Sequence, residues 1–100
     1  MNAKAIPLAI RRAVWARSGY YCEACGGPGA VHLHHRKLRS QGGRHEATNL
    51  MHVHLSCHES IHAHPTRSYL LGHLVHSYDD PADAPIISML SRKWPPGGVA

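Results

Sequence analysis

Two stretches of the sequence decide the fold: YCEACGG at residues 21–27 and HLSCHESIH at residues 54–62. The first contains a Cys-x-x-Cys pair, Cys22 and Cys25, and the second a His-x-x-Cys pair, His54 and Cys57. A spacing of two residues lets one tight turn present both side chains to a single ion. Two such turns supply the four ligands of a closed structural zinc site. The pattern therefore predicts a zinc staple, which contributes folding free energy directly to a small chain.

The same residues leave two alternatives open. Cys-x-x-Cys is also a redox motif, but this chain lacks the βαβ pattern in which thioredoxin-like pairs occur. His52 lies two residues before His54 and could replace it as a ligand. The chain has three cysteines, an odd number that excludes a complete disulfide framework. Cysteine interspersed with histidine favours metal binding in a reducing compartment.

A second group of polar residues lies between the two zinc-ligand pairs and just after the second pair. It comprises His34, His35, Asn49, His58 and His62. His58 and His62 are one helical turn apart, so they share a face and can bind one metal together. A third ligand from a neighbouring strand would leave open positions for water and phosphate. That is the form of a catalytic metal site.

The neighbours His34 and His35 pose a geometric difficulty. Adjacent residues on an ideal strand point to opposite faces of the sheet. Both side chains reach one site only if the strand ends or bulges there. Otherwise His32, on the same face as His34, is a rival ligand.

These motifs together resemble the HNH endonucleases, most closely the compact phage and bacterial members that carry a zinc knuckle. The resemblance covers residues 12–64, and its matching elements are CEACG (22–26), HHR (34–36), RSQGG (39–43), NL (49–50) and CHESIH (57–62). It implies an α+β fold: a small zinc-stapled ββα-metal (His-Me finger) fold with flanking short helices. We expect one HNH nuclease domain over residues 1–100, with residues 1–7 and 95–100 flexible.

The resemblance also implies roles for the second group. His35 would be the general base that takes a proton from the attacking water. Asn49 would orient His35 or pin its loop by hydrogen bonds to the backbone. His34, His58 and His62 would hold one divalent metal (Mg²⁺, Mn²⁺, Ni²⁺ or Zn²⁺), which makes His58 a catalytic residue as well. Such a metal stabilises charge on the scissile phosphate and on the leaving oxygen.

The implied reaction is hydrolysis of DNA phosphodiester bonds, by nicking and with low sequence specificity. Four basic residues would contact phosphates and give affinity that depends on salt and little on base sequence: Arg36, Lys37, Arg39 and Arg44. The charge balance points the same way. Eleven Lys and Arg against six Asp and Glu give a formal charge of +5, which favours a polyanionic partner.

Two departures from the family pattern bear on the metals. The second zinc pair is usually Cys-x-x-Cys, whereas its first member here is His54. Imidazole is a normal zinc ligand, so the zinc site should persist. Many relatives carry Asp at the position of His34. Three nitrogen ligands should favour zinc, nickel or manganese more than a carboxylate-rich site would.

Two other functions remain as alternatives. One is a non-catalytic zinc-binding DNA module that needs the zinc ligands and the basic loop but not His35. The other is an accessory factor of a phage DNA-packaging machine, with a terminase-type partner. In each case we expect a monomer or weak dimer. No stretch approaches the roughly 18 apolar residues of a membrane span, and no signal peptide is recognised. We therefore expect a cytoplasmic protein, in the host cytoplasm if it is phage-encoded.

The apolar pattern and the Gly and Pro positions predict the elements. Helices are expected at residues 8–17 and 56–64, and strands at 30–35, 50–54 and 73–77. The third strand would follow a short helix or turn that begins at Thr66, and the tail from Asp79 should be irregular. Residue 36 to residue 48 should form a polar loop. The expected core comprises Val14, Trp15, Leu50, Val53, Ile61, Leu70, Leu71, Leu74 and Val75.

Overall fold

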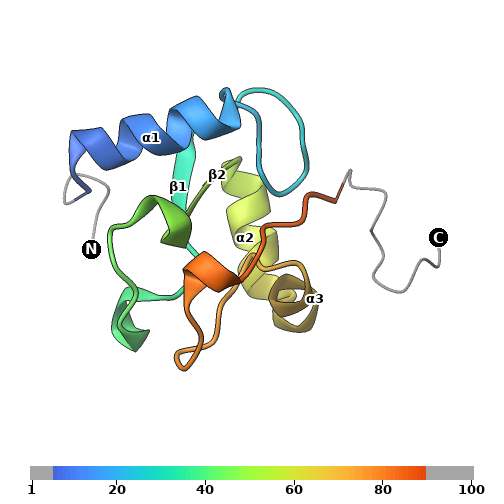
Figure 1. The fold of residues 1–100 in the computed structure, drawn as a ribbon. Helices are drawn as coiled ribbons and strands as arrows, with labels where there is room; N and C mark the ends of the chain where they lie inside the picture. The colour runs from blue at the N-terminus through green and yellow to red at the C-terminus, as the bar shows by residue number, and fades with distance from the viewer. Residues whose placement is uncertain (1–5, 90–100) are drawn as a thin grey trace.

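The fold consists of a two-stranded sheet, three α-helices and a C-terminal segment that wraps back over the sheet (Figure 1). The structure is a computed structural model that describes residues 6–89. In chain order the elements are α1 (Leu8–Ser18), β1 (His32–His35), η2 (Arg39–Gln41), η3 (Ala47–Asn49), β2 (Leu50–Val53), α2 (Leu55–Ala63), α3 (Pro65–Leu70) and η4 (Pro81–Asp83). The predicted α+β class and the order of two strands followed by a helix are confirmed.

Helix α1 forms where the sequence predicted it and extends one residue further. It ends because Gly19 adopts a left-handed conformation with φ of 61° and donates its N–H to the carbonyl of Trp15, a conformation that glycine reaches at little cost. Val14 is buried, while Trp15 is only partly buried and stacks on Tyr20 at 6.1 Å between ring centroids. The helix packs on β2, next to Leu50.

Strands β1 and β2 pair antiparallel, with His34 opposite Met51 and His35 opposite Leu50. Both are shorter at one end than predicted, and β1 begins at His32 rather than at residue 30. Helix α2 contacts β1, so β1 and α2 bring their histidines to a common side. The helix ends before Pro65, as predicted, and Pro65 begins α3, because proline is tolerated at the first helical position.

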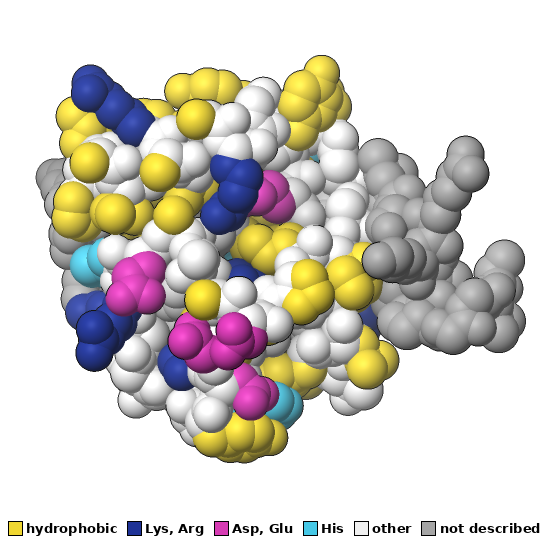
Figure 2. All heavy atoms as spheres, viewed as in Figure 1, with side chains coloured by type: hydrophobic (Ala, Val, Ile, Leu, Met, Phe, Trp, Pro, Cys, Tyr) yellow, Lys and Arg dark blue, Asp and Glu magenta, His cyan; other side chains and the backbone are white. Residues whose placement is uncertain are grey.

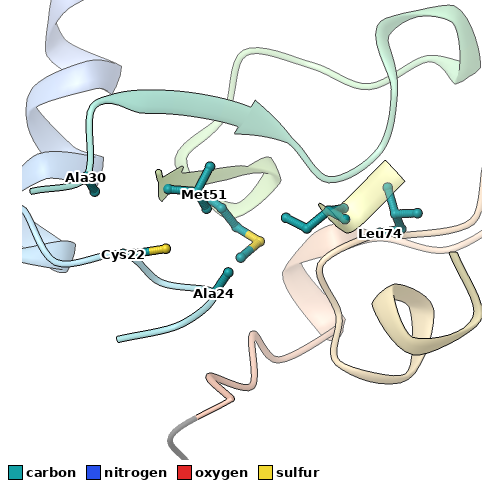
Figure 3. Close-up of a cluster of buried hydrophobic side chains, with 7 residues drawn as sticks. Cys22, Ala24, Ala30, Met51 and Leu74 are labelled. Carbon is teal, nitrogen blue, oxygen red and sulfur yellow. The ribbon is translucent and has the colours of Figure 1, made fainter. Parts of the chain in front are cut away.

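The core is small and partly made of zinc-knuckle residues. Met51 extends from β2 toward Ala24 of the knuckle (Figure 3) and belongs to a cluster with Cys22 and Leu74. Most of the predicted core is confirmed, since these side chains are buried: Val14, Leu50, Val53, Ile61, Leu71, Leu74 and Val75. Leu70 was wrongly predicted, because its position on the outer side of α3 leaves it 60% exposed. The expected flexible ends lie outside the described residues except at Ile6 and Pro7, where Ile6 is buried.

No strand forms at residues 73–77, contrary to the prediction. The apolar residues Leu74 and Val75 suggested a strand. The backbone N–H groups of this segment instead bond to carbonyls of α3 and of the residue after β1. His73 and Leu74 donate their N–H groups to the carbonyl of Ser68, and Val75 donates to the carbonyl of Arg36 at 3.0 Å. The segment is therefore held by backbone bonds to Ser68 and Arg36 rather than by a strand ladder.

Arg36 organises this C-terminal segment from the centre of the molecule. It is 2% exposed, and its guanidinium donates to the carbonyls of Thr48 (2.7 Å), Gly72 (2.7 Å), Pro81 (3.0 Å) and Ala84. Burial lowers its pKa to about 10, so it remains charged at neutral pH. One buried cation thus ties η3 to residues 72–84, because charge-assisted bonds to carbonyls satisfy its donors.

We expect Gly43→Ala to destabilise the protein by about 3 kcal/mol, since it overpacks a closed loop. A Cβ at Gly43 would lie 1.7 Å from the carbonyl oxygen of Lys37, which is a backbone atom that cannot rotate away. Gly42→Ala is the matched control. Gly42 has a φ of 84° with no atom near its Cβ position, so its cost is about 1 kcal/mol for the left-handed backbone. Urea unfolding midpoints at equal zinc content measure both, and equal midpoints would contradict this account.

Candidate metal centres and catalytic cleft

The four predicted zinc ligands lie together where the knuckle meets the start of α2. One ligand atom from each of Cys22, Cys25, His54 and Cys57 lies within 4.8 Å of all the others. Nδ1 of His54 is 3.4 Å from Sγ of Cys25 and 3.9 Å from Sγ of Cys57. A tetrahedral zinc with bonds of about 2.0–2.3 Å places its ligand atoms about 3.3–3.8 Å apart. The donor set and its spacing therefore fit a zinc ion.

The tautomer of His54 also fits this role. Its Nε2 lies 2.7 Å from the carbonyl of Pro28, which can only accept, so Nε2 carries the proton and Nδ1 offers its lone pair. The rival His52 is placed elsewhere. It is 2% exposed in β2, and its Nδ1 lies 2.8 Å from the hydroxyl of Ser18. The geometry therefore assigns the fourth position to His54.

The three thiols lie close enough together to be ligands of one cation. Amide groups point at two of the sulfurs: Cys25 N–H donates to Cys22 and Gly27 N–H donates to Cys25. Burial opposes ionisation of Cys22, but backbone hydrogen bonds from Cys25, His54 and Ala24 leave its pKa below the usual value. Burial and the neighbouring thiols raise the pKa of Cys57 to about 12. A bound divalent cation would remove this conflict, because it favours all three thiolates.

A second cluster joins β1 to α2. His34, His58 and His62 each place a ring nitrogen within 4.8 Å of the others. His34 is 1% exposed, and its Nε2 lies 2.7 Å from the carbonyl of His73. That nitrogen must donate, which leaves Nδ1 unprotonated for a metal. Burial lowers the pKa of His34 to about 3, so the ring stays neutral. Three imidazole ligands fit a zinc or nickel ion.

His32 lies beside this cluster without joining it. Its ring centroid is 4.3 Å from that of His58, and it lines the same cleft. The ring nitrogens that lie within 4.8 Å of one another belong to His34, His58 and His62. The structure therefore favours His34 over His32 as the metal ligand from β1.

A cleft of about 590 Å³ holds the three histidines and His35 together. It is lined by Ile6, His32, Leu33, His34, His35, Leu38, Arg39, Ser40, His58 and His62. His34 and His35 both reach it because β1 ends at His35, which resolves the difficulty posed by adjacent residues on a strand. The cleft therefore contains a candidate metal-ligand cluster and a separate histidine.

His35 has a side-chain partner that the sequence did not indicate. Its Nε2 lies 3.0 Å from Nδ1 of His45, which comes from the loop before η3. Burial, followed by the charges of His45 and Arg39, lowers the pKa of His35 to about 4. The ring is therefore neutral at pH 7 and able to accept a proton. No local spacing in the sequence links His45 to His35, which lies ten positions earlier.

Asn49 pins the loop rather than touching His35. Its Oδ1 accepts the N–H of Lys37 at 2.7 Å, and its Nδ2 donates to the carbonyls of Lys37 (3.1 Å) and Arg44 (3.0 Å). The side chain is 1% exposed. Of its two expected roles, the geometry favours the second, because these bonds close the loop that follows His35.

The predicted phosphate contacts divide into two groups. Arg36 is a correction: it is buried and bonded to four carbonyls, so its charge is not available to DNA. Arg39 is exposed at the cleft. Lys37 and Arg44 line a neighbouring hollow, where the side chain of Arg44 is 80% exposed and lies 3.9 Å from Glu46. Basic side chains thus remain both at the cleft and at the neighbouring hollow, on the two sides of the loop at residues 37–44.

The fold has the strand–strand–helix order of the ββα-metal class, with one side-chain group that could hold zinc and a second group of possible metal ligands in a cleft beside His35. Residues 22–64 match the family model of the HNH endonucleases, which supports membership of that family. The match begins at the first zinc ligand and ends at the close of α2, so it spans both clusters. Searches of curated proteins and of solved structures returned no significant match. In the described part of the chain, no helix has the length and apolar character needed to cross a bilayer.

Proposed function

We propose that the protein is a metal-dependent endonuclease that hydrolyses DNA phosphodiester bonds, nicking one strand at a time with low sequence specificity. The observation that carries this proposal is the placement of neutral His35 in the same cleft as the three-histidine cluster. A metal site alone fits many functions. A metal site beside a separate, unprotonated histidine fits hydrolysis, because one holds the phosphate and the other activates water.

In this proposal, His34, His58 and His62 hold one divalent metal. When bound, it supplies stabilisation of the charge that develops on the phosphate and on the leaving oxygen. His35 takes a proton from a water whose oxygen bonds to phosphorus. The bond from phosphorus to the 3′ oxygen breaks, and that oxygen takes up a proton. The products are a 5′-phosphate and a 3′-hydroxyl.

The remaining residues would bind the DNA backbone and hold the loop and the knuckle in place. Lys37, Arg39 and Arg44 would contact phosphates on either side of the loop and position the strand without reading bases. Asn49 keeps that loop closed through its three hydrogen bonds. The zinc ligands fix the knuckle against the start of α2, which carries two of the metal ligands. Three free thiols suit a reducing compartment such as the cytoplasm.

A plasmid-nicking assay tests the proposal. We expect conversion of supercoiled to open-circular DNA with magnesium, manganese, nickel or zinc, and its loss in EDTA. His58→Ala should lower the rate by about 10²-fold or more, since even partners of metal ligands contribute 10–100-fold. His64→Ala is the matched control, because His64 is an exposed histidine of the same region outside the cluster.

Circular dichroism after EDTA treatment separates loss of the catalytic metal from loss of the structural zinc. DNA binding without cleavage in any metal would contradict the nuclease proposal. That result would favour a zinc-dependent DNA-binding module, or an accessory factor that cleaves only beside a packaging-machine partner.

A further inference from the structure

Three aromatic rings form a stacked ladder that runs from the core to the surface beside the active-site loop. Tyr69 of α3 packs against the core cluster, and His76 lies parallel to it at 3.9 Å between centroids and 4° between planes. Tyr78 continues the stack on His76 at 5.0 Å and 5°. Tyr78 is 80% exposed, so the side of its ring away from His76 faces solvent. The ladder holds one large aromatic face in place at the surface.

Tyr78 forms one wall of a hollow of about 420 Å³. The same hollow is also lined by the active-site loop, with Lys37, Gly42, Gly43 and Arg44. In Figure 1 the green loop that carries η2 and the orange loop that precedes η4 border this region. The next residues of the active-site loop, 38–40, line the catalytic cleft. One loop therefore separates the aromatic hollow from the catalytic cleft, and a strand crossing it would reach both.

The charges around the hollow decide what it can accept. Lys37 and Arg44 offer cations from the loop, and three acidic residues also line the hollow: Glu46, Asp79 and Asp80. Figure 2 shows most of the acidic side chains of this face in its lower half, with one more beside a basic side chain in the upper half. A duplex would bring rows of phosphates against these carboxylates, which is unfavourable. A single base presents an uncharged ring, and its one phosphate can lie toward the two cations.

We propose that Tyr78 is a stacking platform for an unpaired nucleobase of a DNA strand whose neighbouring phosphate lies in the catalytic cleft. Aromatic rings bind the faces of all four bases, so the platform needs no base readout. The rings stacked beneath Tyr78 fix its orientation before binding, so less side-chain conformational entropy is lost when a base binds. This proposal rests on the proposed nuclease function and names its preferred substrate class: DNA with a single-stranded segment or a displaced base.

The test measures binding in the His35→Ala background, without added divalent cation, so that cleavage does not interfere. The probes are a short single-stranded oligonucleotide that carries one 2-aminopurine, and the corresponding blunt duplex. We expect the full chain to quench 2-aminopurine fluorescence in the single strand. Tyr78→Leu should abolish the quenching and weaken single-strand affinity by roughly tenfold, within the range of about 5- to 150-fold for one base stack. Duplex affinity should change little.

Two further variants make the result specific. Tyr78→Phe keeps the ring and should retain both quenching and affinity. Tyr21→Leu removes another exposed tyrosine, on the zinc knuckle, and should leave both unchanged. Absence of quenching by the full chain would overturn the platform, as would an equal loss of single-strand and duplex affinity in Tyr78→Leu. Because no cleavage is measured, these outcomes are independent of the plasmid-nicking result.

Discussion

His35→Ala is expected to lower the rate of DNA cleavage by about 10²- to 10⁴-fold, the contribution of one positioned general base. The expected effect is large because His35 lines the cleft beside the metal-ligand cluster and because its pKa, lowered to about 4 by burial, keeps it unprotonated at pH 7. Its side chain is only partly buried, so its removal should leave the fold intact. Single-turnover cleavage of a nicking substrate measures the effect.

Three controls separate loss of the base from loss of structure. Zinc content, the melting temperature and DNA affinity of His35→Ala should all match the parent protein. Added imidazole should restore part of the cleavage, because a small base can occupy the space left by the ring. Cleavage at the parental rate would show that another group takes the proton, and His45, at 3.0 Å from His35, would then be the first residue to replace.

Cys57→Ser is expected to unfold the protein at neutral pH, the largest effect on stability that we predict. Structural zinc contributes roughly 10–16 kcal/mol in small zinc-binding peptides at pH 7, whereas a whole domain is typically stable by only about 5–15 kcal/mol. Here the zinc ligands also supply part of the core, since Cys22 packs with Met51 and Leu74. Losing the ion therefore loosens the sheet as well as the knuckle. Circular dichroism and zinc release to a chelating dye measure both changes.

His54→Cys is the matched variant for the zinc site. It restores a Cys-x-x-Cys pair with Cys57, and we expect it to keep both zinc and fold, whereas His54→Ala should lose both. His52→Ala tests the rival ligand: it should retain zinc, because the Nδ1 of His52 lies against Ser18 instead. A folded, zinc-free Cys57→Ser protein would show that the apolar core suffices without the ion.

The sequence predicted best what depends on local spacing. Cys22 and Cys25 must turn toward one point because only two residues separate them, and His58 and His62 share a face because a helix has 3.6 residues per turn. The same reasoning gave α1 and α2 to within one residue at each end. Glycine and proline marked their ends for backbone reasons that do not depend on the rest of the fold.

The sequence predicted poorly what depends on distant partners. Arg36 stands among basic loop residues, and only the folded chain brings the carbonyls of residues 48, 72, 81 and 84 around it. The pairing of His45 with His35, and of the His73 carbonyl with His34, has the same origin. Leu70 fails for a related reason, because a short helix can turn an apolar side chain outward without breaking any local rule.

The hydrogen bonds of the buried Arg36 guanidinium determine how short a fragment of this chain can be and still fold. The family match ends at residue 64, yet three of the four carbonyls that Arg36 binds lie at residues 72, 81 and 84. A fragment trimmed to the matched segment would lose three of the four carbonyl acceptors of this cation and the chain that covers it. It would also lose the carbonyl that orients His34. Grafts or fusions of this module should therefore carry the chain through residue 87, where the carbonyl of Ile87 accepts from His73.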